Sequence, residues 1–129
     1  MREIFDSSWA NCASFANALE VQTCFAYPLF FVIGSTIGNG TSMLGLSQAF
    51  FDSQSYMGDI VNDLGIFMEN HDNKRWLTAY GPDKRLFENA ITLVGTWTGI
   101  PFNYYGCEQD MVGGIDPENR VPLWKYGYN

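Results

Sequence analysis

Short apolar segments alternate with helix-like segments along this chain, and this alternation limits the possible folds more than any other feature. The segments with the composition of short strands are 21–26 (VQTCFA), 64–68 (LGIFM) and 100–105 (IPFNYY). Helical patterns lie between them, one from Thr41 or Ser42 to about Phe51 and one from Pro82 to Gly99. Strands that alternate with helices predict parallel β/α units, so we expect an α/β fold.

Patterns within these segments give more detailed expectations. The runs 64–68 and 100–105 are typical of strands buried on both faces. A proline at position 28 disfavours a helix at Tyr27, and 34–40 is rich in turn residues. The first helix is expected to place Met43, Leu46 and Phe50 on one face. The second is expected to begin at Pro82 and Asp83 and to have one broad apolar face: Leu86, Phe87, Ala90, Ile91, Val94 and Trp97.

Composition and charge exclude several classes of protein. Hydrophobic residues make up 47% of the 129 residues and charged residues 16%, which fits one globular domain rather than a disordered chain. The formal net charge is -7, so we expect no binding to nucleic acid or to an anionic membrane surface. The most apolar stretch, 24–37, is interrupted by Tyr27, Pro28 and Gly34, so no membrane span is expected. Residues 1–6 lack the pattern of a signal peptide.

The aromatic residues and cysteines leave more than one interpretation open. Aromatic residues make up 16% of the chain, and they can fill a core or form a platform for a ligand. The 3 cysteines are widely spaced and His71 is the only histidine, so no Cys/His zinc site is expected. At most one disulfide can form within the chain, between partners that the sequence does not select.

Polar clusters follow two of the expected strands, at the ends where parallel sheets gather functional residues. The segment 69–73 (ENHDN) comes directly after the run 64–68. The segments 106–110 (GCEQD) and 113–120 (GGIDPENR) follow the last strand. These clusters are therefore the candidate functional site.

Each cluster also has a purely structural interpretation. The first fits a simple turn in which Asn70 and Asp72 cap backbone groups. In the second, Asp116 and Arg120 are four positions apart, which fits a local ion pair on a short helix that begins at Pro117.

Taken together, these segments resemble the α-amylase family of retaining glycoside hydrolases. The segment 67–73 (FMENHDN) is similar to the family's FxxNHD motif at the end of barrel strand seven. The segment 99–106 (GIPFNYYG) is similar to its eighth strand, and 113–120 is similar to the substrate-contacting loop beyond it. Upstream, 3–6 (EIFD) and 26–29 (AYPL) are similar to strands five and six. The resemblance implies a single, partial catalytic domain, the C-terminal half of a (β/α)8 TIM barrel from the end of strand five to strand eight.

The resemblance also implies roles for individual residues. Glu3 would be the general acid/base, Asp72 a further carboxylate that stabilises the transition state, and His71 a hydrogen-bond donor to the same sugar ring. Asp116 and Arg120 would bind glucose units on the non-reducing side of the cleaved bond. The implied substrate is an α-1,4-glucan, namely starch, glycogen or a maltooligosaccharide.

The family places its nucleophilic aspartate on strand four and its calcium ligands in the first half of the barrel. The resemblance therefore implies that residues 1–129 lack both groups and are inactive on their own, although the intact family enzyme would bind calcium and is typically secreted. Met1 and Arg2 precede Glu3 where the family has an apolar strand and a glycine. An exposed terminal glutamate is therefore an equal alternative to a catalytic one.

Two other functions are consistent with the same residues. One is a non-catalytic α-glucan-binding module that keeps Asp72, Asp116, Arg120 and the aromatic residues. The other is part of a related transglycosylase, because the loop after strand eight is shared with cyclodextrin-forming enzymes. A half-barrel also leaves open strand edges at both ends, which predict self-association or aggregation.

Overall fold

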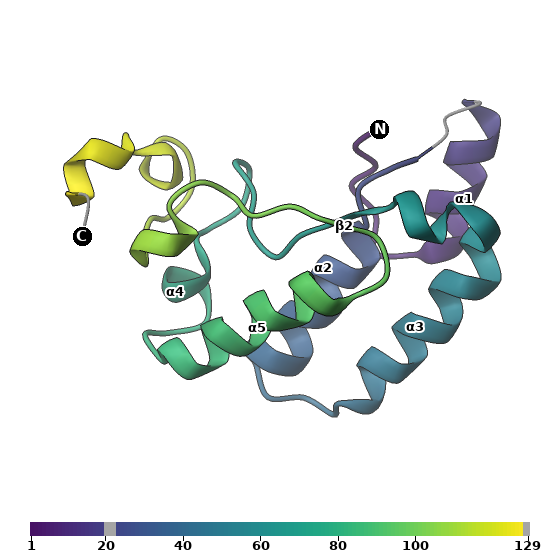
Figure 1. The fold of residues 1–129 in the computed structure, drawn as a ribbon, viewed down its shortest axis with the longest axis horizontal. Coiled ribbons are helices and arrows are strands. Elements are labelled where there is room, and N and C mark those ends of the chain that lie inside the picture. The colour runs from purple at the N-terminus through teal and green to yellow at the C-terminus, as the bar shows by residue number, and fades with distance from the viewer. Residues whose placement is uncertain (20–22, 128–129) are drawn as a thin grey trace.

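The computed structural model describes residues 1–19 and 23–127, which form a helix-rich arrangement with short parallel strands (Figure 1). In chain order the elements are α1 (Trp9–Ala18), α2 (Tyr27–Ile33), η1 (Gly34–Gly38), α3 (Leu44–Met57), η2 (Gly58–Asp63), β1 (Gly65–Ile66), α4 (Trp76–Ala79), α5 (Lys84–Thr96), β2 (Ile100–Pro101), η3 (Cys107–Gln109), η4 (Glu118–Arg120) and η5 (Leu123–Tyr126). The sequence patterns above do not predict α1 or α4. Within the described ranges, no helix combines the length and the apolar character that crossing a bilayer requires.

The strand segments run parallel and pair in the order of the sequence. Arg2 pairs with Cys24, Phe25 pairs with Gly65, and β1 pairs with β2 through Gly65 and Ile100. Because these pairs are parallel, the carboxyl ends of the segments lie at one edge of the sheet. The predicted parallel pairing is therefore confirmed.

The predicted strand 64–68 is buried as expected, whereas the predicted strand 100–105 is not. Leu64 and Ile66 are fully buried, because both belong to the hydrophobic core, together with residues such as Leu29 of α2 and Val94 of α5. Ile100 of β2 is 44% exposed, because β2 pairs only with β1 among the described residues. The expectation that both faces of 100–105 are buried was therefore wrong. Of the predicted strand 21–26, residues 21 and 22 fall outside the described part of the chain, and among the described residues only 24 and 25 form bridges.

The segment after the first bridges corrects two further expectations. α2 begins at Tyr27 and has Pro28 in its first turn, where a missing N–H costs no helical hydrogen bond. The expectation of no helix at Tyr27 was therefore wrong. η1 continues α2 as a π-helical turn, so the turn predicted for 34–40 begins only at Asn39. A Cβ at Gly34 would collide with the Tyr80 hydroxyl, which explains a glycine at this close approach.

α3 is longer than predicted and buries a different face. It buries Ala49, Ser53 and Met57, whereas Met43 and Phe50 are exposed. The spacing of apolar residues in the sequence predicts a helix, but it does not show on which side of the helix other elements pack. Here α1 and α2 pack against α3 and select the face that is buried.

α5 has the predicted cap and apolar face, but it begins at Lys84 and not at Pro82. Asp83 caps it by accepting a hydrogen bond from the Arg85 N–H at 3.0 Å, and Phe87, Ala90 and Val94 are buried. The helix ends at Thr96, short of Gly99. Figure 1 shows α2, α3 and α5 below β2, with the loops and the C-terminal segment above and to the left. The edge of the sheet that carries these loops is where the candidate site lies.

Candidate functional site

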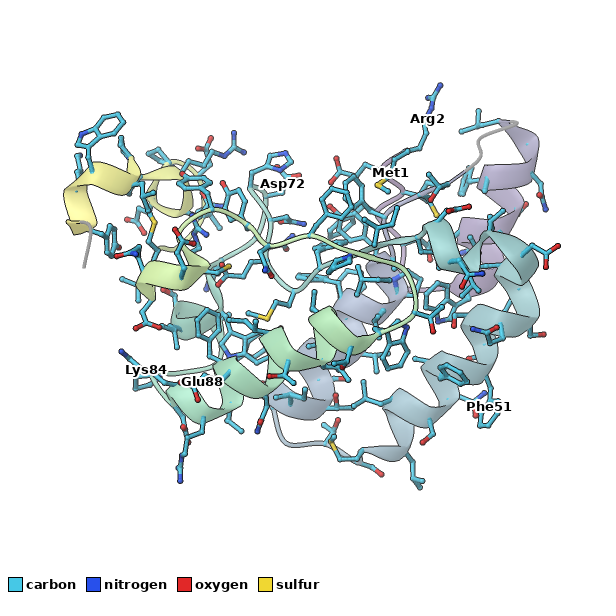
Figure 2. The ribbon with its side chains drawn as sticks, viewed as in Figure 1. Met1, Arg2, Phe51, Asp72, Lys84 and Glu88 are labelled. Atoms are coloured by element: carbon cyan, nitrogen blue, oxygen red, sulfur yellow. The ribbon has the colours of Figure 1, made fainter. Side chains whose placement is uncertain are left out.

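Titratable side chains from separate strand ends meet at the loop edge of the molecule. A carboxylate oxygen or ring nitrogen from each of Glu3, His71 and Asp72 lies within 4.8 Å of the other two. Figure 2 shows Asp72 at the edge opposite Phe51 and Lys84, which belong to the helical side. The structure therefore brings together residues that are nearly seventy positions apart in the chain.

The turn that carries His71 and Asp72 is fixed by Asn70. Its Oδ1 accepts hydrogen bonds from the backbone N–H groups of Asp72 at 3.1 Å and Asn73 at 3.0 Å. Its Nδ2 donates to the Tyr27 hydroxyl at 3.0 Å, which links the turn to α2. The capping interpretation is therefore right for Asn70, whereas the Asp72 carboxylate contacts the side chains of His71 and Arg120.

Asp72 is the centre of a group of polar side chains that we call the exposed cluster: His71, Asp72, Asp116 and Arg120. The Asp72 carboxylate lies 3.3 Å from His71 Nε2 and 3.3 Å from Arg120 Nη2. Arg120 Nε also lies 3.3 Å from Asp116 Oδ1, so the predicted local ion pair is present as well. These side chains are between 41% and 59% exposed, so water screens each pair and a ligand hydroxyl can replace a partner.

Glu3 is held next to the exposed cluster by Tyr27. The Arg2 N–H donates to the Thr23 carbonyl at 2.9 Å, and the Phe25 N–H donates to the Arg2 carbonyl at 2.9 Å, so the ladder reaches the residue before Glu3. The Tyr27 hydroxyl donates to Glu3 Oε1. Burial, followed by this hydrogen bond, raises the pKa of Tyr27, so the hydroxyl stays a donor well into the alkaline range. Glu3 is exposed, which agrees with the expectation of an exposed terminal glutamate. Its side chain is nevertheless held in place by the hydrogen bond from Tyr27.

A pocket of about 190 Å³ lies beside these residues and combines aromatic rings with polar groups. Its lining consists of Glu3, Phe25, Tyr27, Phe67, Glu69, Asn70, His71, Phe102, Asn103 and Tyr104. The ring of Phe67 makes edge-to-face contacts with Phe25 and Tyr27, which gives a rigid apolar surface. An apolar surface with hydrogen-bonding groups beside it suits a sugar ring, which has apolar faces and hydroxyl groups at its edge.

A buried ion pair that the sequence analysis does not single out lies next to the exposed cluster. Arg75 Nη1 lies 3.1 Å from Glu69 Oε2, and the two side chains are 0% and 1% exposed. Sequence reasoning also misses Tyr27 and Asn119, which hold Glu3 and the turn in place. The sequence gives only a weak signal for this ion pair, because a buried pair and an exposed pair of charged residues have the same spacing in the sequence.

The group Glu3, His71 and Asp72 also raises the question of a metal ion. Calcium prefers about six to eight oxygen ligands in proteins. Here one of the three donors is an imidazole nitrogen, and Asp72 is already paired with Arg120. This donor set does not fit calcium.

Comparison with known proteins gives one consistent result. The family model described as alpha amylase, catalytic domain, matches residues 3–122. Alpha-amylase 1 of Lipomyces kononenkoae is 48% identical over 128 residues, which cover 98% of this chain and 20% of that protein. Alpha-amylase 2 of Schwanniomyces occidentalis is 36% identical over 128 residues, which cover 98% of this chain and 24% of that protein. This chain therefore spans about a fifth to a quarter of the length of these curated relatives.

Solved structures and a transferase sequence extend the comparison. An alpha-amylase from Malbranchea cinnamomea matches with a TM-score of 0.88 at 28% identity, covering 98% of this chain and 26% of that chain. The cyclomaltodextrin glucanotransferase CldA matches with a TM-score of 0.82 at 28% identity, with the same coverage of 98% and 26%. A cyclomaltodextrin glucanotransferase of Bacillus sp. (strain 1011) is 41% identical over 85 residues, which cover 66% of this chain and 12% of that protein.

Proposed function

Because the chain belongs to the α-amylase family, we propose that residues 1–129 supply the acid/base side of a catalytic site for α-1,4-glucans. In this proposal the parallel strand segments correspond to strands five to eight of a (β/α)8 barrel. The pairing order from Arg2 through Cys24 and Gly65 to Ile100 supports this assignment. The other strands, the nucleophile and the calcium ligands of the intact protein are proposed to lie outside residues 1–129.

Glu3 acts as the general acid/base in the proposed double displacement. It first donates a proton to the oxygen of the bond that breaks, and later accepts a proton from the attacking water. An aspartate outside residues 1–129 attacks the anomeric carbon in between, so the configuration of the sugar is retained. Tyr27 keeps the Glu3 carboxyl oriented through its hydrogen bond.

Asp72 holds sugar hydroxyls and stabilises the positive charge that develops in the transition state. Its closeness to Glu3 also fits a pair of nucleophile and acid, since such carboxyl groups stand about 5 Å apart in retaining enzymes. The contacts of the Asp72 carboxylate with His71 Nε2 and with Arg120 favour the stabilising role, because partners bound to a carboxylate reduce its nucleophilicity. His71 then donates hydrogen bonds to the same ring, and Asp116 and Arg120 bind neighbouring glucose units.

The observation that carries this proposal is the convergence of Glu3 with the exposed cluster beside one pocket. Isothermal titration with maltoheptaose tests it. The wild-type chain is expected to bind, and Asp72→Asn is expected to bind about tenfold more weakly because a charge-assisted contact is lost. Asp59→Asn is the matched control, because this exposed aspartate lies in η2, before β1 and at its opposite end. A wild-type chain that gives no binding heat contradicts the proposal.

The inactivity of residues 1–129 alone is tested with a chromogenic maltoheptaoside. No hydrolysis is expected, because the proposed nucleophile is not among these residues. Hydrolysis by residues 1–129 alone would contradict the proposal that the nucleophile lies outside these residues.

A second candidate function is transglycosylation, which the similarity to cyclomaltodextrin glucanotransferases favours. The acid/base side serves hydrolysis and transfer alike, because either water or a sugar hydroxyl can give up its proton to Glu3. Cyclic products from starch and the full-length protein indicate transfer, whereas linear products indicate hydrolysis. A non-catalytic glucan-binding module predicts binding without any turnover by the full-length protein.

The exposed edge of β2 is proposed to mediate self-association of residues 1–129. Ile100 is 44% exposed there, and unpaired strand edges promote pairing between chains. Light scattering is expected to show species larger than a monomer, and Ile100→Lys is expected to shift them towards the monomer. A monodisperse wild-type monomer contradicts this part of the proposal.

A further inference from the structure

A buried arginine connects the two loops that carry the exposed cluster. Arg75 and its partner Glu69 are 0% and 1% exposed, and taking two charges out of water is costly. Hydrophobic residues of similar volume often give the same stability as a buried ion pair. A role in stability alone therefore does not explain why charges occupy these positions.

The guanidinium reaches three segments at once. Its Nη1 donates to Glu69 Oε2 at 3.1 Å and to the Tyr105 carbonyl at 2.8 Å, and its Nε donates to the Asn119 carbonyl at 3.0 Å. The backbone N–H of Arg75 donates to the Gly113 carbonyl at 3.0 Å. One residue thus joins the end of β1 to both ends of the loop 113–120.

Aromatic rings enclose the same guanidinium. Arg75 Cζ lies 4.0 Å from the ring centroid of Tyr104 and 4.8 Å from that of Tyr105. Stacking on aromatic rings favours the planar guanidinium over a lysine ammonium. Because Tyr104 also lines the pocket, Arg75 supports the pocket wall as well as the loops.

Asn119 extends the connection from Arg75 to the turn. Its side chain is fully buried, and its Nδ2 donates to the carbonyls of His71 at 2.7 Å and Asn73 at 2.9 Å. The next residue, Arg120, donates to the same His71 carbonyl at 3.0 Å. The loop and the turn are therefore joined by hydrogen bonds that all depend on where Asn119 is held.

We propose that Arg75 is a positioning residue that fixes the loop 113–120 against the turn 69–73. It acts through Glu69 and Asn119 and does not touch the substrate. Its effect is to keep the exposed cluster, whose members come from both segments, facing one ligand. The proposal rests on the proposed function only for the identity of that ligand.

Hydrogen–deuterium exchange of Arg75→Lys tests this role. Lysine keeps the positive charge but cannot reach all three acceptors together. Amides in 69–73 and 113–120 are expected to exchange about tenfold faster, whereas those of α5 keep their wild-type rate. If the exchange rates of α5 rise to the same degree, Arg75 contributes only to global stability, and the proposal is overturned. Unchanged exchange in both segments overturns it as well.

Arg85→Lys is the matched control. Arg85 also pairs with a carboxylate, Asp83, at 2.8 Å, but its side chain is 87% exposed. This variant is expected to leave exchange unchanged throughout. The affinity for maltoheptaose, measured on the same samples, is expected to fall about tenfold in Arg75→Lys and to stay the same in Arg85→Lys. If the wild-type chain binds no maltoheptaose, the proposed function fails, while the exchange result still decides the role of Arg75.

The wild-type chain provides the test if Arg75→Lys does not fold. In NMR at low urea concentrations, the Nε–H of Arg75 is expected to lose protection together with the amides of 113–120 and before those of α5. This order shows that the arginine and the loop open as one unit. An Arg75 Nε–H that exchanges only with global unfolding, or as fast as that of Arg85, overturns the proposal.

Discussion

The pairs Glu69–Arg75 and Asp72–Arg120 are made of the same kinds of side chain, yet they differ in almost every physical respect. The closest atoms are 3.1 Å apart in the first pair and 3.3 Å apart in the second. The side chains of the first pair are 1% and 0% exposed, whereas those of the second are 47% and 41% exposed. Contact distance is therefore a poor guide to what an ion pair does in this protein.

The difference shows that the two pairs have different roles. The buried charges fix the position of the site, whereas the exposed charges are free to bind a ligand. In the buried pair no water can replace a lost partner, so the geometry is fixed. In the exposed pair water already competes for both groups, so a sugar hydroxyl can take its place at small cost. The predictions below test this separation, beginning with the loss of a buried partner, which has the largest expected effect.

Loss of one buried partner is expected to have the largest effect. Arg75→Met leaves the Glu69 carboxylate buried and unpaired, so the free energy of unfolding should fall by about 3–5 kcal/mol. Arg120→Met should change it by only about 0–1 kcal/mol, because its partners are exposed. Urea denaturation measures both values. Equal losses in the two variants would remove the distinction between the pairs.

Replacement of both buried charges sharpens the comparison. Glu69→Leu combined with Arg75→Met should recover only part of the lost stability. No charge is left unpaired, but the Trp76 N–H and the carbonyls of Tyr105 and Asn119 lose their partners. Amide exchange in 113–120 should nevertheless stay fast, because the hydrogen bonds to the loop are gone. Restored protection in this double variant would show that packing alone holds the loop.

Salt is expected to act on one pair and not on the other. Raising the NaCl concentration from about 0.05 M to about 0.5 M shortens the screening length and should reduce the coupling energy of Asp72 and Arg120 by about 0.5 kcal/mol or less. The coupling of Glu69 and Arg75 should not change, because ions do not enter the buried site. Double-mutant cycles at the two salt concentrations measure both couplings, and an equal response would contradict the assignment of burial.

The last prediction concerns pH. Cys107 donates to Glu69 at 3.2 Å, and burial, followed by the charge of Glu69, raises the pKa of its thiol from 9.0. A pKa that is higher in the folded state contributes stability that is fully present below about pH 9 and lost as the pH rises further. The wild-type chain should therefore lose stability more steeply than Cys107→Ala between about pH 9 and about pH 11. The urea midpoint at stepped pH measures the slopes, and equal slopes would contradict the prediction.

The predictable part of the fold is the part with strong local signals. α5 could be predicted because the Asp83 cap and its apolar spacing lie within one segment. The buried face of α3 could not be predicted, because α1 and α2 select it from outside the helix. The exposure of β2 likewise depends on its neighbours and not on its apolar composition.

The candidate site divides in the same way. His71 and Asp72 could be singled out because they follow an apolar strand directly, and the ion pair of Asp116 and Arg120 could be expected from their spacing. The contact between Arg120 and Asp72 could not be predicted, because it joins residues that are 48 positions apart in the sequence. Tyr27 carries no distinctive pattern that would place it beside Glu3.

The amino-acid sequence by itself determined the order of parallel strand segments and the polar residues at their ends, because both follow from short-range patterns of apolar and polar side chains. Only the tertiary structure decided which charges are removed from water. Glu69 and Arg75 are buried because the loop 113–120 and the ring of Tyr104 fold over them from distant parts of the chain. The burial of a charge depends on the whole assembly of segments, so no local pattern encodes it for Glu69 and Arg75.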